Sequence, residues 1–263
     1  MGLITSPRNA RVTGALSLRT RAGRRETGRF LVEGPAAVRE ALRKGVVAEI
    51  FRDPEVVGDA GEVASEAAGA GVPVLDVTPR VLDRLAATVS PRGPIAICDR
   101  VDVPIERIEP ARGVVCVLVE IRDPGNLGAV IRSADAAGAA GVVVSDASVD
   151  VYNEKVVRAS AGSMFHVPIV DGGRVTDVAR AFRDQGCTLW GAAADGTIDV
   201  FEAPTEGPVA VFFGNEAHGL ALDARALMDE SIRVPMRGGA ESLNLAAAAA
   251  VVLFELARRR SLG

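Results

Sequence analysis

Residues 114–119 are apolar at every position, and a polar segment containing glycine, asparagine and proline follows them. A strand exposed on one face would alternate apolar and polar side chains, so this run predicts a parallel strand that is buried on both faces. Runs that are wholly or largely apolar recur at 142–144, 187–193 and 209–213, with helical patterns between them. Residues 113–263 are therefore expected to form an α/β domain around a mainly parallel sheet.

The first hundred residues show the same alternation on a smaller scale. Pro35 and Pro79 stand where a proline can occupy the first helical position. The strand and helix patterns alternate, and parallel strands with crossover helices are the simplest solution. Residues 102–112 contain two prolines and mixed charges, so we interpret them as a linker between residues 1–101 and 113–263. The elements expected before this linker are strands at 30–32, 46–51, 72–77 and 95–101 and helices at 35–45, 53–69 and 79–85.

After the linker, the same reasoning predicts strand 114–119, a loop at 120–128 and a helix from 129 to 138. The remaining elements expected are strands at 142–144, 166–170, 187–193, 209–213 and 232–234 and helices at 153–161, 174–185, 221–228 and 243–260.

The charge of the chain is unevenly distributed, although its net value is only −4. Residues 1–45 contain ten basic and three acidic residues, which gives +7 there and −11 in the remainder. This asymmetry predicts a face directed at phosphates, with a solvated helix surface as the alternative. Aromatic residues make up only 4% of the chain, so platforms that stack bases are not expected. The candidate RNA-binding residues are Arg8, Arg11, Arg19, Arg21, Arg24 and Arg25.

Several classes of protein are disfavoured by composition. Cys98, Cys116 and Cys187 lie far apart in apolar runs, which favours reduced core residues over disulfides. With only two histidines, metal sites and histidine triads are poorly supplied, and no metal is expected. The longest uncharged apolar run, 245–254, is about half as long as a membrane span. No secretory signal is visible, so a cytoplasmic location without membrane contact is expected.

Three turns, at 123–128, 214–220 and 234–244, follow predicted strands of the second block. Ligands of open α/β sheets bind beyond the carboxyl ends of strands, so these turns are the first candidates for a site. We expect Arg132, about one helical turn beyond the first turn, to reach back over it. Ser242 is a candidate cap for the last helix. Each turn taken alone is better explained by ordinary turn chemistry.

Taken in order, the three turns resemble the signature motifs of the SpoU (TrmH) branch of the SPOUT RNA methyltransferases. The matches are N-x-G-x-x-x-R at 126–132, G-N-E-x-x-G-L at 214–220 and V-P-M-x-G-x-x-x-S-L-N at 234–244. Residues 1 to about 100 also resemble the N-terminal substrate-binding domain of the family, which is similar to ribosomal protein L30e. That likeness is carried by Asn9, the basic stretch and residues 30–34. The chain departs from the usual pattern at Leu245 and Ala246, where valine and serine are commoner.

The resemblance implies a SPOUT α/β fold whose C-terminal part is threaded into a trefoil knot and binds S-adenosylmethionine. It implies methyl transfer to a ribose 2′-hydroxyl of RNA, with 23S rRNA as the expected substrate, no role for DNA, and homodimers formed through the C-terminal domain. By the same likeness the cofactor-binding residues are Gly214, Asn215, Val234, Pro235, Met236 and Leu243, and the reaction site comprises Asn126, Arg132, Glu216, Ser242 and Asn244.

The family proposal gives the role of base to Arg132, but an arginine side chain stays protonated at neutral pH. We therefore expect Arg132 to anchor a phosphate beside the target ribose and to acidify the hydroxyl electrostatically, while Asn126 orients Arg132 or the ribose. Three alternatives stay open: a tRNA 2′-O-methyltransferase, a catalytically inactive RNA-binding member, and a nucleotide-cofactor oxidoreductase that uses Gly125 and Gly128.

Overall fold

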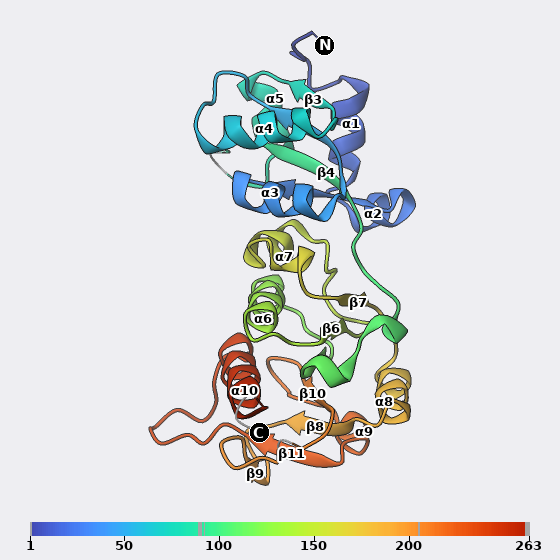
Figure 1. Cartoon of the computed structure of the whole chain (residues 1–263), viewed down its shortest axis with the longest axis vertical. Helices are drawn as coiled ribbons and strands as arrows, with labels where there is room; N and C mark the ends of the chain where they lie inside the picture. Colours follow the sequence, from blue (N-terminus) through green and yellow to red (C-terminus); the bar gives the residue numbers. More distant parts are fainter. Residues whose placement is uncertain (1, 89–90, 92, 205, 261–263) are drawn as a thin grey trace. The chain divides into compact units, whose positions relative to one another are not determined.

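The structure is a computed structural model that describes residues 2–88, 91, 93–204 and 206–260. The chain forms two compact units (Figure 1). The first contains Met1–Val101 and Tyr152–Phe165, and the second contains Asp102–Val151 and His166–Gly263. The sequence pattern had assigned residues 152–165 to the second block, because strand and helix patterns do not show which sheet a helix packs against. No helix in the described ranges is long and apolar enough to cross a membrane.

The sheet of the first unit is mixed rather than parallel, so the all-parallel expectation is wrong. β4 (Ile95–Asp99) lies between β1 (Arg29–Glu33) and β2 (Val47–Arg52) and is antiparallel to both. Among the described strands of this unit, β3 (Val74–Asp76) alone pairs in parallel, with β2. Hydrophobic patterning predicts where strands occur but carries no information on their direction, which is why the simplest topology failed.

Five helices from the first hundred residues belong to this unit. Prolines begin α3 and α5 as expected. α4 begins six residues later than expected, because residues 53–58 form a turn that ends at Gly58 with a positive φ of 74°. The helices α1 and α2 were not predicted; Asn9 and Thr20 cap them through side-chain oxygens. Their bounds are α1 Ala10–Ser17, α2 Arg21–Thr27, α3 Pro35–Lys44, α4 Asp59–Gly69 and α5 Pro79–Leu85.

The late segment 152–165 completes the core of the first unit. It contains α7 (Glu154–Ala159) and places Tyr152 and Phe165 near Phe30, with ring centroids 4.6 and 6.3 Å away respectively. All three rings are buried.

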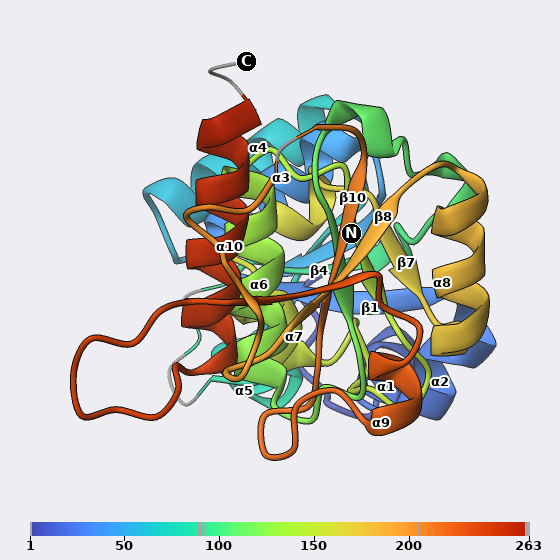
Figure 2. The same ribbon diagram turned by 90° about the horizontal axis from the view of Figure 1, so that it is seen from below.

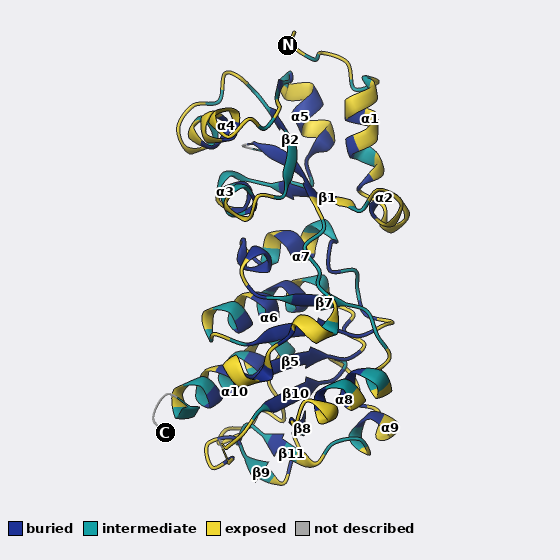
Figure 3. Cartoon of the chain, turned by 45° about the vertical axis from the view of Figure 1, so that its right-hand side comes forward, coloured by how far each residue is buried: buried dark blue, intermediate teal, exposed yellow. Residues whose placement is uncertain are grey.

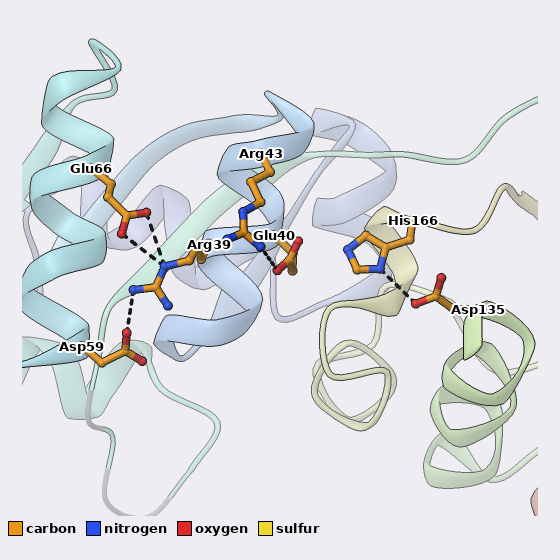
Figure 4. A network of polar contacts seen from close by, with 7 residues as sticks. All are labelled: Arg39, Glu40, Arg43, Asp59, Glu66, Asp135 and His166. Atoms are coloured by element: carbon orange, nitrogen blue, oxygen red, sulfur yellow. Dashed lines mark hydrogen bonds and ion pairs between the residues drawn. The ribbon is translucent and has the colours of Figure 1, made fainter. Parts of the chain in front are cut away.

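Ion pairs join α3 to α4 in the same unit. Arg39 of α3 donates to two carboxylates of α4 (Figure 4), at 2.6 Å from Asp59 and 3.2 Å from Glu66.

The second unit contains a seven-stranded sheet in the order β7-β6-β5-β10-β8-β11-β9, and every strand pair in it is parallel. This confirms the mainly parallel sheet. The central strands β5 and β10 are buried at every residue (Figure 3), as their uninterrupted apolar runs predicted. The bounds are β5 Val115–Leu118, β6 Gly141–Val144, β7 Ile169–Asp171, β8 Thr188–Ala192, β9 Ile198–Asp199, β10 Val209–Phe213 and β11 Glu230–Arg233.

Residues 102–112 pack within the second unit, as a free linker would not. They form two short 3-10 turns, Ile105–Arg107 and Pro110–Arg112. Between them Ile108 is only 1% exposed and belongs to the hydrophobic core. A Cβ at Gly141 would lie 2.3 Å from the Ile108 side chain, so this glycine makes room for it.

Helices α6 (Pro124–Ala136) and α10 (Leu245–Arg260) lie side by side and contact each other (Figures 1 and 2). α8 (Val175–Asp184) and the short α9 (Leu222–Arg225) contribute to the hydrophobic core with β5, β8 and β10. Residues 234–244 carry the chain from β11 to α10, which contacts α6.

Candidate active site

The first turn of the site is shorter than expected because α6 begins at Pro124. Asp123 caps this helix, and its Oδ1 accepts a hydrogen bond from the backbone N–H of Asn126 at 2.7 Å. Asn126 therefore lies in the first turn of a helix. The prolonged loop to residue 128 was inferred from glycine content, but Pro124 after a capping aspartate is itself a helix start.

Hydrogen bonds join all three turns through their polar side chains. Asn126 Nδ2 donates to Glu216 Oε1 at 3.2 Å, and Asn126 Oδ1 accepts from Asn244 Nδ2 at 2.9 Å. Glu216 also accepts from the backbone N–H groups of Asp123 at 3.0 Å and Arg122 at 3.2 Å. The amide of Asn126 is thus held between an acceptor on one side and a donor on the other, so it has little freedom to orient Arg132.

The carboxylate of Glu216 is held in its charged form. Partial burial acts to raise its pKa, but hydrogen bonds from its own backbone, from Asp123 and Arg122, and from the Asn126 side chain outweigh it, and the pKa is lowered. A carboxylate that is ionised at neutral pH and already accepts several hydrogen bonds is a weak proton acceptor. Its chemistry is that of a fixed negative charge and of an anchor for the first turn.

The second turn is a tight backbone hairpin that follows β10. Asn215 and Gly219 exchange two backbone hydrogen bonds of 3.0 and 2.8 Å, and the Asn215 side chain donates to the carbonyl of Glu120 at 2.9 Å. A Cβ at Gly214 would lie 2.1 Å from the backbone of Gly219. Only glycine fits at residue 214, because the hairpin folds directly back over it.

The third turn leads into α10, and the structure corrects the assignment of its cap. Asn244 Oδ1 accepts from the backbone N–H groups of Ala246 at 2.9 Å and Ala247 at 3.4 Å, so Asn244 caps the helix. Ser242 lies too far before Leu245, where α10 begins, to do so. It lines the cavity described next instead. Asn244 therefore has two roles, since the same side chain also donates to the first turn.

A cavity of about 370 Å³ lies between the second turn, the third turn and α10. Of the residues expected to bind the cofactor, Gly214, Asn215, Val234, Met236 and Leu243 line it, and Pro235 does not. The sequence reasoning missed residues 192–195 at the end of β8 and just after it, and Leu245, Ala248 and Val252 on α10, which also line the cavity. The rule that ligands bind at strand ends would have pointed to 192–195, but it was applied only to turns with glycine and asparagine.

The chemistry of this cavity fits S-adenosylmethionine. Leucine and valine side chains give apolar walls suited to an adenine ring, and backbone groups of the two turns supply hydrogen-bonding atoms. Three carboxylates line the cavity, on Asp195, Glu216 and Glu241, and they complement a cationic sulfonium centre. Arg225 and Arg233 also line the cavity, and Arg225 pairs with Asp195 at 2.5 Å.

The structure does not bring Arg132 to this site, contrary to expectation. Because α6 begins at Pro124, Arg132 stands six residues after Asn126, about 240° around the helix axis from it. Its side chain is exposed and lines neither the cofactor cavity nor the recess around Asn126, Glu216 and Asn244. It makes no hydrogen bond or ion pair with any residue that the structure describes. The reach over the turn assumed a helix that starts at residue 129.

The candidate RNA-binding arginines lie before α1, on α1 and α2, and between these two helices, and they are not equivalent. Arg24 is only 4% exposed and donates to the carbonyl of Leu18 at 2.8 Å, so it is a structural residue and is withdrawn as an RNA contact. Arg11 and Arg19 are exposed but paired with Glu49 and Glu154. Among these candidates, the exposed side chains of Arg8, Arg21 and Arg25 have no such partner in the described part of the chain.

Comparisons with known proteins agree with this geometry. The model of the SpoU rRNA Methylase family matches residues 113–254, and that of an MRM3-like substrate binding domain matches residues 9–96. The 23S rRNA (guanosine(2553)-2′-O)-methyltransferase RlmP of Bacillus subtilis is 33% identical over 257 residues, which cover 97% of this chain and 99% of that protein.

Two solved structures resemble the whole chain. The AdoMet-bound rRNA methyltransferase from Sinorhizobium meliloti has a TM-score of 0.87 and 32% identity, covering 100% of this chain and 99% of that one. The SpoU methyltransferase AviRb from Streptomyces viridochromogenes, in complex with the cofactor AdoMet, has a TM-score of 0.85 and 32% identity. The match covers 97% of this chain and 100% of that one. These likenesses confirm the SPOUT fold class and the cofactor. The chain belongs to the SpoU rRNA methylase family and is an S-adenosylmethionine-dependent RNA 2′-O-ribose methyltransferase.

Proposed function

We propose that the substrate of this enzyme is 23S rRNA. The observation that supports this most is the similarity to RlmP, an enzyme named for 23S rRNA, which spans nearly the whole of both chains and therefore includes both units. With this substrate we also propose a cytoplasmic location. A tRNA substrate and an inactive RNA-binding role are the outcomes against which the proposal is tested.

Within the site, the residues of this chain act mainly by positioning. The bound cofactor supplies an electrophilic methyl group on its sulfonium. Glu216 fixes the first turn through the N–H groups of Arg122 and Asp123, and its negative charge favours a cationic centre nearby. Asn126 and Asn244 hold the second and third turns in register with α6. This frame keeps the recess beside Asn126, Glu216 and Asn244 open for the ribose.

We assign RNA binding to the first unit, residues 1–101 and 152–165, and methyl transfer to the second unit, residues 102–151 and 166–263. The exposed, unpaired Arg8, Arg21 and Arg25 support this role, because neutralising phosphates releases counterions and gives salt-dependent affinity. Arg11 and Arg19 are weaker contributors, since each already pairs with a carboxylate.

The active enzyme is proposed to be a homodimer formed through α6 and α10. Phe254 is 49% exposed on α10, and the exposed Ala247 lies on the same side of that helix, two turns away. Small residues beside an exposed aromatic ring suit close packing of a second copy. In this dimer Arg132, exposed on the neighbouring α6, completes the reaction site of the other subunit and binds a phosphate next to the target ribose.

Ribose methylation mapping tests the substrate. Cells with and without the gene, and with Glu216→Gln, are compared by mapping 2′-O-methyl groups in 23S rRNA and tRNA. We expect one 23S rRNA position to lose its methyl group in the deletion strain and in the variant. A methyl group lost from tRNA instead would reject the proposed substrate, and no lost methyl group in any RNA would favour an inactive RNA-binding protein.

Mixing two inactive variants tests whether Arg132 acts on the partner. Arg132→Ala and Glu216→Gln subunits are exchanged in equal amounts and assayed for methyl transfer. If Arg132 serves the other subunit, half of the dimers have one complete site, so activity returns to about a quarter of wild type. If it serves its own subunit, no complete site forms and the mixture stays inactive. A monomer in sedimentation at assay concentration would also refute the dimer.

A further inference from the structure

A second hollow shares the 214–220 turn with the cofactor cavity. Its volume is about 870 Å³, more than twice that of the cofactor cavity. Asn215, His218 and Gly219 line both spaces, so the turn forms a partition between them. The remaining wall comes from the ends of β5 and β6, the first turn of α8 and the residues around α9. We call this space the α8–α9 hollow.

The wall of the α8–α9 hollow has an apolar part that belongs to the core of the unit. Val119 and Ala224 are buried there, and Val175 and Leu227 are partly buried against the same core. These side chains are aliphatic, so the wall is a smooth surface without an aromatic platform. A flat heterocyclic ring can bury apolar area against such a surface.

Positively and negatively charged side chains both line the α8–α9 hollow. Arg122 and Arg174 supply guanidinium groups, and Glu120, Asp146 and Asp223 supply carboxylates. The mixture does not suit a purely anionic ligand such as free phosphate. It suits a nucleotide, whose base edge offers both donors and acceptors and whose phosphate pairs with arginine.

The two arginines retain donors for a ligand. The Arg122 side chain makes no hydrogen bond or ion pair with the residues described, although its backbone N–H donates to Glu216. Arg174 uses Nε and Nη2 for Asp177, at 2.8 and 3.4 Å, and its Nη1 is left over. Guanidinium carries five N–H donors, so one carboxylate does not exhaust it.

Arg122 also connects the hollow to the reaction site. It lines the α8–α9 hollow and, in addition, the recess that contains Asn126, Glu216 and Asn244. A polynucleotide that places one ribose in this recess can therefore continue past Arg122 into the hollow. Two neighbouring nucleotides would then occupy two neighbouring spaces.

We propose that the α8–α9 hollow binds a nucleotide of the substrate RNA adjacent to the one that is methylated. Its base lies against the apolar wall formed by Val119 and Ala224, and its phosphate contacts Arg122 and Arg174. This inference rests on the proposed function in taking RNA as the substrate, and it adds a place where the enzyme reads sequence or shape next to the target.

Filling the hollow tests the proposal. Ala221 is exposed, lines the hollow and has extended backbone angles, so Ala221→Trp occupies the space without disturbing the backbone. Ala226→Trp, at the other end of α9 and outside the hollow, is the matched control. We expect Ala221→Trp to raise the KM for RNA about tenfold or more, the equivalent of losing one well-buried base. The control should change it less than about twofold, with cofactor Kd and melting temperature unchanged in both.

A charge variant gives an independent readout. Arg174→Ala is compared with Arg180→Ala, because both side chains approach Asp177 on α8 but only Arg174 lines the hollow. Loss of one phosphate contact should reduce the slope of log Kd against log salt by about 0.7–0.9 for Arg174→Ala alone. An unchanged slope, together with an unchanged KM in Ala221→Trp, would overturn the proposal.

The assays use the full-length protein with a 23S rRNA transcript and with bulk tRNA, and they follow the RNA that wild type methylates. If that RNA is tRNA, the proposed substrate fails while the hollow is still tested on tRNA. If wild type methylates 23S rRNA and both hollow variants behave like their controls, the hollow fails while the proposed substrate stands.

Discussion

Asn244 caps α10 with its oxygen and contacts Asn126 with its nitrogen, so two substitutions can separate the two roles. Asn244→Asp retains an oxygen for the N–H groups of Ala246 and Ala247, and aspartate caps helices about as well as asparagine. The donor to Asn126 is lost, and two oxygen acceptors then face each other where a bond of 2.9 Å stood. Asn126 cannot relieve this by rotating its amide, because its oxygen would then face the Glu216 carboxylate.

The structure sets the size of the effect. An unsatisfied polar group costs about 1–3 kcal/mol when buried, and Asn244 is exposed, so we expect about 1–2 kcal/mol. This corresponds to a loss of roughly 5- to 30-fold in kcat/KM, with little change in melting temperature. Asn244→Ala removes the cap as well, at about 1 kcal/mol, and should lower the melting temperature by about 2–4 °C. Its kcat/KM should fall less, by about 2- to 10-fold, because the Asn126 oxygen can bind water instead.

The measurements are methyl transfer to RNA from a radiolabelled donor and thermal unfolding of each variant. The two variants should rank in opposite order by activity and by stability. The deficit of Asn244→Asp should also shrink at low pH, since a protonated carboxyl can donate to Asn126 again. Activity losses that follow stability losses in both variants, or full activity in Asn244→Asp, would refute the proposed link between the turns.

Three further predictions follow from single side chains. Gly214→Ala should abolish cofactor binding in calorimetry, because its Cβ would lie 2.1 Å from the Gly219 backbone; measurable binding would contradict this. Arg24→Ala should lower stability by about 1.5–3 kcal/mol in urea unfolding, whereas Arg25→Ala should leave stability unchanged and weaken RNA binding. The pKa of Asp229 is lowered in the folded protein: burial acts to raise it, but hydrogen bonds from Leu189 and Arg183 outweigh the burial. The ionised carboxylate therefore stabilises the fold above the pKa that Asp229 has in the unfolded chain, and this stabilisation is lost as the pH falls through the folded pKa. Asp229→Asn should therefore be less stable than wild type at neutral pH. Its free energy of unfolding should also fall less steeply than that of wild type as the pH is lowered.

Sequence patterns that arise from burial predicted the observed elements correctly. The uninterrupted apolar runs of β5 and β10 correctly predicted central parallel strands, because only a strand buried on both faces tolerates no polar side chain. The prolines at the starts of α3 and α5 were equally informative, since proline fixes the first helical turn. These signals are local, and they need no knowledge of partners.

Features that depend on contacts between residues far apart in the sequence could not be predicted. Nothing in the sequence of β4 shows that it pairs antiparallel to both of its neighbours, or that Ile108 in a proline-containing segment fills a space over Gly141. The candidate active site shows the same difference between local and long-range information. The motif residues were found by their spacing, but the hydrogen bonds between Glu216, Asn126 and Asn244 became visible only in the fold. The expected start of α6 was five residues too late, so Arg132 was expected to reach back over the first turn although it stands more than two helical turns beyond the start of α6.

The late segment 152–165 bears on how the protein is made. Phe30, in β1, is covered by Tyr152 and Phe165, which leave the ribosome more than a hundred residues later. By then β5 and β6 of the other unit have already been synthesised. Folding during translation is therefore interleaved, and an expression fragment ending at residue 101 would present a bare apolar surface to solvent and to its neighbours.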